Sequence, residues 1–245
     1  MSIVQLFGGS VRGPAHILDN LPNQDALMLR RLGKLGTLAV VCDGMGSRPY
    51  ADIGARKACK AVQAAIKKLG NSGFSPKVLI PEIHRQWVQR VQPLRTQDAV
   101  TTCLFAWVLP DGRTLAAQLG DGLIYGRVNN DSWQLSPTDK AFGNATTGLG
   151  IAKKLSDWRW RIFEETTNSI EISMMTDGIS DDLLPESYSA FASEMRKALN
   201  FKNSRHAKKW LKHQLDNWPV PLHGDDKTFA AIYLGNGHGC AETQS

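Results

Sequence analysis

The sequence predicts an α+β fold in which helices cover β-sheets, and three observations support this prediction. Apolar residues recur at strand spacing in most of the chain and at helical spacing elsewhere, with turn-forming residues between these segments. Strand-like and helix-like segments do not alternate regularly, as they would in a parallel β–α–β fold. No repeat, low-complexity tract or linker divides the chain, so the sequence predicts one domain over residues 1–245.

The first half of the chain is predicted to form strands followed by two helices. Residues 2–8 and 37–42 are apolar runs of strand length, and the second is continuous enough for a strand buried on both faces. From Ala51 to Leu69 apolar residues recur at helical intervals, with lysines between them. Ser75 is placed to cap a second helix that begins at Pro76.

After Asp98 the apolar spacing changes to that of strands. Successive strand-like segments with turn sequences between them predict an antiparallel meander, at residues 99–109, 114–120, 123–128 and 132–136. Two further alternating segments, at 158–163 and 170–174, precede a mainly helical stretch. Residues 228–234 form the last predicted strand.

The composition is typical of a globular protein without membrane spans. Hydrophobic residues make up 42% and charged residues 21% of the chain. No run approaches the ~18 apolar residues of a transmembrane helix, and the N-terminus lacks the pattern of a signal peptide. The cysteines do not have the spacing of a zinc site or disulfide scaffold: Cys42, Cys59, Cys103 and Cys240. We therefore expect a cytoplasmic protein that does not associate with membranes.

The formal net charge of +6 is unevenly distributed. Basic residues gather in one stretch without an intervening acid: Arg196, Lys197, Lys202, Arg205, Lys208, Lys209 and Lys212. Such a stretch could contact nucleic acid or an acidic partner, but it is more often the solvated face of a helix. Apolar residues within it could supply the buried side of that helix: Phe201, Trp210, Leu211 and Leu215.

Four aspartates lie at the ends of predicted strands. Asp43, Asp121 and Asp177 each follow a strand and precede a glycine, and Asp225 comes shortly before the last strand. Each alone is an ordinary turn residue. Together they indicate a carboxylate cluster, which needs cations to offset its repulsion. Oxygen ligands of this kind suit Mg²⁺ or Mn²⁺, whereas a zinc site would be expected to use His and Cys.

Seven segments of the chain are similar, in order, to the successive motifs of one family. They read PNQDA, VVCDGMGS, AVTTCLFAWV, AAQLGDGLIYGRV, TTGLG, SMMTDGISDDL and DDKTFAAIYL. They resemble the motifs of PP2C-type metal-dependent Ser/Thr protein phosphatases, and the short chain is most similar to the bacterial members. The resemblance implies a β-sandwich of two antiparallel sheets flanked by α-helices, with a metal site at one edge between the sheets.

The same resemblance implies which residues bind metal ions. Asp43, Asp177 and Asp225 match the carboxylates of the first catalytic metal. Asp43 and the backbone carbonyl of Gly44 match the ligands of the second metal. Asp121 matches a ligand of a third, weaker metal.

Two more acidic residues are assigned by the resemblance. Asp25 would orient waters on the metals. In the segment GDDKT the family's register favours Asp225 as the ligand and places Asp226 at a position that is Asn in the family. A shift of this register by one residue stays open.

The implied cofactors are two Mn²⁺ or Mg²⁺ ions, with a third at the weaker site. The implied reaction is hydrolysis of phosphoserine or phosphothreonine by a water activated between the two ions, without a Ser or Cys nucleophile. The implied partners are phosphorylated proteins, the substrates of a Ser/Thr kinase, which suggests a role in signalling. We expect the protein to be a monomer.

The chain departs from the family pattern near this site. Asn20 stands where the family has an Arg that binds the substrate phosphate, and Arg12 and His16 are the candidates to replace it. Ser47 replaces a glycine in the loop after the first metal-binding Asp. Only residues 141–145 occupy the place where many bacterial relatives have a longer flap.

Two other functions stay open. The missing Arg is compatible with a catalytically weak or inactive PP2C-like regulator that binds phosphoproteins, although the intact aspartates argue against it. The basic stretch is compatible with a nucleic-acid-binding protein. Because the strands lack the aromatic–basic stacking motifs of nucleic-acid-binding modules, we expect no nucleic-acid partner.

Overall fold

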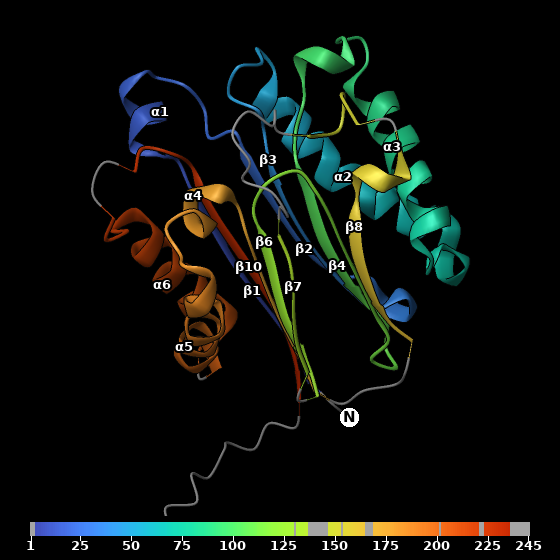
Figure 1. The fold of residues 1–245 in the computed structure, drawn as a ribbon, viewed down its shortest axis with the longest axis vertical. Coiled ribbons are helices and arrows are strands. Elements are labelled where there is room, and N and C mark those ends of the chain that lie inside the picture. Colours follow the sequence, from blue (N-terminus) through green and yellow to red (C-terminus); the bar gives the residue numbers. More distant parts are fainter. Residues whose placement is uncertain are drawn as a thin grey trace, which may run out of the picture.

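The computed structural model describes residues 3–129, 131–136, 147–152, 154–164, 169–200, 202–220 and 223–235. Within these residues, two antiparallel sheets of five strands each lie face to face (Figure 1). The first contains, in spatial order, β1 (Ile3–Val11), β10 (Lys227–Gly235), β9 (Ile170–Met175), β6 (Leu123–Val128) and β7 (Asp131–Leu135). The second contains β2 (Asp25–Arg31), β3 (Thr37–Asp43), β4 (Cys103–Val108), β5 (Thr114–Leu119) and β8 (Arg159–Phe163). The prediction of an α+β sandwich is confirmed.

Helices cover the outer face of each sheet (Figure 1). α2 (Ala51–Leu69) packs on β2 and β3, and α3 (Pro76–Val91) packs on α2. On the other side are α5 (Tyr188–Asn200) and α6 (Ser204–Asp216). The short α1 (Pro14–Leu18) and α4 (Asp177–Ser180) lie near one end of the sandwich. Short 3₁₀ segments occur at Gly33–Leu35, Gly70–Gly73, Thr96–Asp98, Leu155–Asp157 and Pro185–Ser187.

The apolar run that predicted β3 is explained by burial on both faces. Leu38, Val40 and Cys42 belong to the cluster beneath α2 and α3, whereas Ala39 and Val41 belong to the cluster between the two sheets. All five side chains are fully buried. Because successive residues of a strand point to opposite faces, this double burial requires an apolar residue at every position. It also fixes the end of β3, which carries Asp43.

The prediction for α2 is confirmed at both ends, and α3 begins at Pro76 as predicted. The Ser75 side chain makes no capping hydrogen bond. In α6, Leu211 and Leu215 are buried, as expected for the apolar side of the basic stretch; Phe201 lies outside the described residues. Among the helices of the described segments, none has the length and apolarity to cross a membrane.

One strand was missed, and one expectation about the strands was wrong. The sequence did not predict β2, an edge strand on which partly exposed residues alternate with buried ones. The predicted meander is interrupted, because β5 and β6 belong to different sheets. The chain crosses between the sheets at Gly120 and Gly122, whose φ angles of 86° and 98° favour glycine. Residue spacing shows that a strand is buried, but it does not show to which sheet the strand belongs.

Candidate metal centre

A pocket of about 280 Å³ lies between loops that connect the strands. It is lined by Asp43 at the end of β3, Asp121 between β5 and β6, Asp177 at the start of α4, and Asp225 before β10. The structure therefore brings together the four aspartates that the sequence placed at strand ends. They come from both sheets, so the pocket exists only when the two sheets are packed together.

The backbone around Asp43 is held firmly. Its N–H donates to the Thr102 hydroxyl (2.8 Å), and its carbonyl oxygen accepts from the Thr101 hydroxyl (2.8 Å) and from the N–H of Thr102 (2.7 Å). Gly44 also lines the pocket, and a Cβ added there would lie 2.4 Å from the carbonyl oxygen of Ala51. Only glycine fits so close to the first turn of α2.

Asp25 lies behind the pocket. It is opposite Asp43 in the pairing of β2 with β3, and it is 7% exposed. Its Oδ2 accepts a hydrogen bond from the Thr176 hydroxyl (2.9 Å), which in turn accepts from the N–H of Thr228 (3.1 Å). Its buried Oδ1 has no hydrogen-bond partner among the described residues. An unpartnered buried carboxylate oxygen is costly, so it points to a group that the protein binds.

The electrostatics of the pocket favour binding of a positive charge. Burial raises the pKa of Asp25, Asp43 and Asp177, and it is the largest cause for each. Repulsion from neighbouring carboxylates adds to this effect. For Asp43 the neighbours are Asp25, Asp177 and Asp225, and a hydrogen bond with Asp177 raises its pKa further. A divalent cation in the pocket would offset both burial and repulsion.

The donor set fits a hard cation. The side chains in the pocket offer carboxylate oxygens, which Mg²⁺ and Mn²⁺ prefer. In the part of the chain that the structure describes, no three His, Cys, Asp or Glu side chains already form a metal-binding group. The carboxylates therefore line a common pocket without converging on one point.

Asp226 has a different environment from its neighbour Asp225. It is 2% exposed; its Oδ1 accepts from the N–H of Gly13 (2.6 Å) and its Oδ2 from that of Gln24 (2.6 Å). These bonds join the start of β10 to the segments that precede α1 and β2. Asp225 is exposed and lines the pocket. This arrangement supports the register that makes Asp225 the metal ligand.

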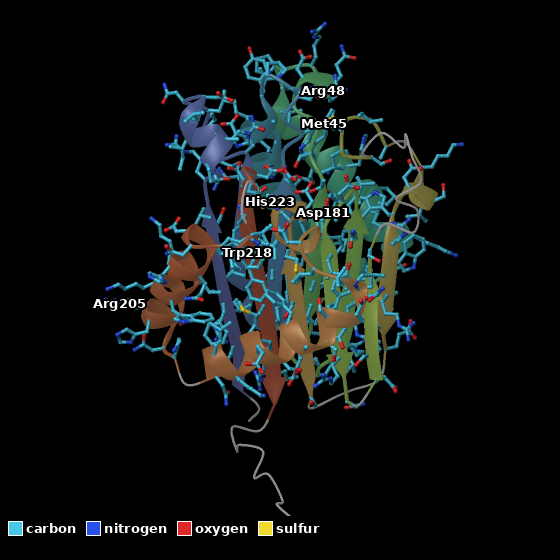
Figure 2. The ribbon with its side chains drawn as sticks, turned by 60° about the vertical axis from the view of Figure 1, so that its left-hand side comes forward. Met45, Arg48, Asp181, Arg205, Trp218 and His223 are labelled. Atoms are coloured by element: carbon cyan, nitrogen blue, oxygen red, sulfur yellow. The ribbon has the colours of Figure 1, made fainter. Side chains whose placement is uncertain are left out.

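The two candidates for phosphate binding lie in different places. His16, on α1, lines the carboxylate pocket, and its Nδ1 is 2.9 Å from Oδ2 of Asp226. Arg12 is exposed and donates to the carbonyl oxygen of Leu21 (3.1 Å). It lines a neighbouring pocket together with Trp218 and not the carboxylate pocket. Figure 2 places Trp218 below His223, the residue shortly before Asp225.

Some residues that shape the site were not singled out in the sequence. Gln118 is 1% exposed, and its Nε2 donates to the carbonyl oxygens of Gly120 (3.1 Å) and Gly122 (3.0 Å), which flank Asp121. A polar residue inside the apolar segment LAAQL was the available signal. Thr176, which fixes Asp25, gave no such signal. The short segment 141–145 lies outside the described residues.

Comparison with solved structures shows the same fold. The photosystem II phosphatase PBCP matches with a TM-score of 0.66 at 13% identity, covering 95% of this chain and 99% of that one. PppA of Pseudomonas aeruginosa, a regulatory component of T6SS, matches with a TM-score of 0.64 at 15% identity. The match covers 95% of this chain and 98% of that one. The catalytic domain of the Ser/Thr phosphatase PstP, solved with two manganese ions, matches with a TM-score of 0.60 at 17% identity. The match covers 96% of this chain and 100% of that one.

The family is shown by sequence. No curated protein matches the chain. A sequence model of the family described as "Protein phosphatase 2C" matches residues 12–216, which is most of the chain and includes Asp25, Asp43, Asp121 and Asp177. The chain therefore belongs to the protein phosphatase 2C family and is a PPM-type phosphatase.

Proposed function

We propose that this protein removes phosphate from phosphoserine and phosphothreonine in proteins and depends on two Mn²⁺ or Mg²⁺ ions. The observation that carries the proposal is the pocket lined by four strand-end aspartates, of which Asp43 and Asp177 have pKa values raised by burial. Asp43, Asp177 and Asp225 would hold the first ion, and Asp43 with the carbonyl of Gly44 the second. Asp121 would hold a third, weaker one. When bound, such ions neutralise phosphoryl charge and make water a stronger nucleophile.

Asp25 has a supporting role in this proposal. Thr176 fixes one of its oxygens, and the other has no partner among the described residues. That second oxygen is suited to accept a hydrogen bond from a water in the pocket and to orient it. Burial is the largest cause of the raised pKa of this carboxyl group.

His16 is the better candidate to bind the substrate phosphate. It lines the pocket, whereas Arg12 does not. Nδ1 of His16 lies 2.9 Å from Oδ2 of Asp226, which orients the ring, and an imidazole N–H can donate a hydrogen bond to a phosphate oxygen. Arg12 would have to leave its hydrogen bond with Leu21 to take this role.

The direct test is phosphate release by the purified protein. It is assayed on an aryl phosphate and on a phosphothreonine peptide, with Mn²⁺, Mg²⁺ or EDTA. We expect turnover with either metal and none with EDTA. Asp43→Asn should remove it, whereas the surface variant Asp111→Asn should not, because Asp111 pairs with Arg113 in a turn away from the pocket. A parent protein that is inert with both metals and both substrates contradicts the proposal.

A second candidate function has one observation in its favour. With Asn20 at the usual Arg position and Arg12 outside the pocket, no guanidinium among the described residues lines the site. A PP2C-like regulator that binds phosphoproteins without turnover would have such a site. Inert protein that still binds a phosphothreonine peptide in an anisotropy titration would support this alternative. In either case we propose phosphoprotein partners of a Ser/Thr kinase, a monomer of one domain and a cytoplasmic location.

A further inference from the structure

A second hollow, of about 500 Å³, lies on α6 away from the carboxylates. We name it the α6 face and define it by the residues that line it: Lys202, His206, Lys209, Trp210 and His213. The spacing of three and four residues places His206, Lys209, Trp210 and His213 on one side of the helix, and Lys202 lies just before its first turn. Leu211 and Leu215 lie on the other side of the helix. They are buried in the apolar cluster between the helices and the outer face of the first sheet. The α6 face is therefore exposed while the helix is firmly anchored.

The α6 face carries positive charge without local compensation. No Asp or Glu occurs from residue 203 to residue 215, and the same stretch also contains Arg205, Lys208 and Lys212. Among the described residues, no lysine or arginine from 202 to 212 forms an ion pair. Nearby cations on α5 behave differently, since Lys197 pairs with Glu194 and Arg196 lies 3.6 Å from Glu171.

An aromatic ring lies within this positive surface. Trp210 is partly buried against the core and partly open to the hollow, and the Lys202 ammonium lies 5.6 Å from its ring centroid. A helix face that serves only solubility does not need an indole among its charges. Trp is among the residues that anchor protein interfaces, because it offers a large rigid surface with little entropy to lose.

We propose that the α6 face is a docking surface for an acidic segment of a protein partner. Acidic side chains of the segment would pair with Lys202 and Lys209, and one apolar or aromatic side chain would lie on Trp210. The helical part of the face, from His206 to His213, extends about 10 Å along α6, the length of about three extended residues, and Lys202 lies just before the helix. The partner is therefore a short linear segment.

The docking surface lies apart from the carboxylate pocket. In Figure 2, Arg205 is at the lower left edge of the molecule, whereas Met45, which lines the carboxylate pocket, lies near the top, and the two pockets share no lining residue. An acidic segment bound here would belong to the same phosphoprotein as the phosphorylated residue but to another part of its sequence. Docking would raise the local concentration of the phosphorylated residue at the pocket. This part of the proposal rests on the proposed function.

Two other anionic partners fit the α6 face less well. A membrane-surface helix needs several apolar residues that can enter the lipid, but Leu211 and Leu215 are already buried in the protein. Binding of duplex DNA requires contacts to many phosphates along a long surface. The uncompensated charges here lie on one short helix with a single indole.

The test is a binding titration that does not depend on catalysis. A fluorescein-labelled peptide with four Glu residues around one Phe is titrated with the full-length protein, and anisotropy is recorded. The same peptide with Gln for Glu tests the need for charge. The variant Lys202→Glu/Lys209→Glu removes the proposed contacts. Lys60→Glu/Lys67→Glu, two exposed positions on α2, makes the same change of net charge elsewhere.

We expect the α6 variant to weaken binding of the acidic peptide at least tenfold, and the α2 variant to weaken it less than twofold. The Gln peptide should not bind. Equal losses in the two variants, or tighter binding of a short DNA duplex or of phosphatidylserine vesicles than of the peptide, overturn the proposal. Hydrolysis of an aryl phosphate, measured on the same samples, reports the proposed function separately. The α6 variant should match the parent in that assay.

Discussion

Asp25 and Asp43 lie directly opposite each other in the pairing of β2 with β3. Two carboxylates on neighbouring strands are thus held at one end of the sheet, where burial raises the pKa of both. Opposed like charges weaken a sheet. Holding these two carboxylates together lowers the stability of the protein. A bound cation would offset this loss.

The first prediction concerns metal and pH. Since the folded-state pKa values of Asp25, Asp43 and Asp177 are raised, the folded protein binds more protons than the unfolded chain. Without metal, stability should therefore fall as the pH rises above the ordinary Asp value of 3.8. Mn²⁺ should raise Tm at neutral pH and have little effect near pH ~4. Thermal unfolding with Mn²⁺ and with EDTA checks this. A Tm at neutral pH that does not respond to Mn²⁺ would contradict it.

The second prediction separates activity from stability at Asp43. Asp43→Asn should lower kcat/KM by about a thousandfold or more, equivalent to about 4 kcal/mol of transition-state stabilisation. In EDTA the same variant should unfold at a higher temperature than the parent, because one repelling carboxylate is gone. Asp177→Asn and Asp225→Asn should lower activity similarly. Asp121→Asn should cost less, mainly at low metal concentration. An active Asp43→Asn protein would refute the assignment.

The third prediction distinguishes Asp225 from Asp226. Asp226→Ala removes the acceptor for the N–H groups of Gly13 and Gln24 and should lower the free energy of unfolding by about 3 kcal/mol. Asp225→Ala should leave this free energy nearly unchanged in EDTA but abolish the Mn²⁺-dependent rise in Tm. Urea unfolding of both variants measures the difference. The reverse pattern would mean that the register is shifted by one residue.

The fourth prediction concerns the substrate phosphate. His16→Gln should raise KM for a phosphopeptide by roughly 10- to 100-fold, equivalent to a lost charge-assisted hydrogen bond of about 1.5–3 kcal/mol. Metal affinity should not change, because His16 donates nothing to the metal in this proposal. Arg12→Ala serves as the matched control and should leave KM close to that of the parent. If Arg12→Ala has the larger effect, the Arg side chain moves into the pocket when substrate binds.

The sequence predicted most elements because burial leaves a strong pattern. β3 and α2 were predicted within a residue of their observed bounds, since each needs apolar residues at positions set by its own geometry. β2 has a weaker pattern because several of its side chains are partly exposed at the sheet edge. The crossing between β5 and β6 depends on glycine conformation and on Gln118, which spacing does not reveal. Spacing also does not show whether Arg12 or His16 lines the pocket, because this depends on the path of the chain through the short helix α1.

The position of β10 has a consequence for synthesis of the protein. β10 lies between β1 and β9, and residues 3–11 pair with residues 227–235. While the ribosome makes the intervening chain, β1 has no neighbour in its sheet, and its backbone groups are open to wrong partners. Pairing of β1 must wait until β10 has been made, and contacts so distant in sequence form slowly. Asp225 is made just before β10, so a nascent chain that has not yet released residues 225–235 lacks both the strand that joins β1 to β9 and one of the aspartates that line the pocket.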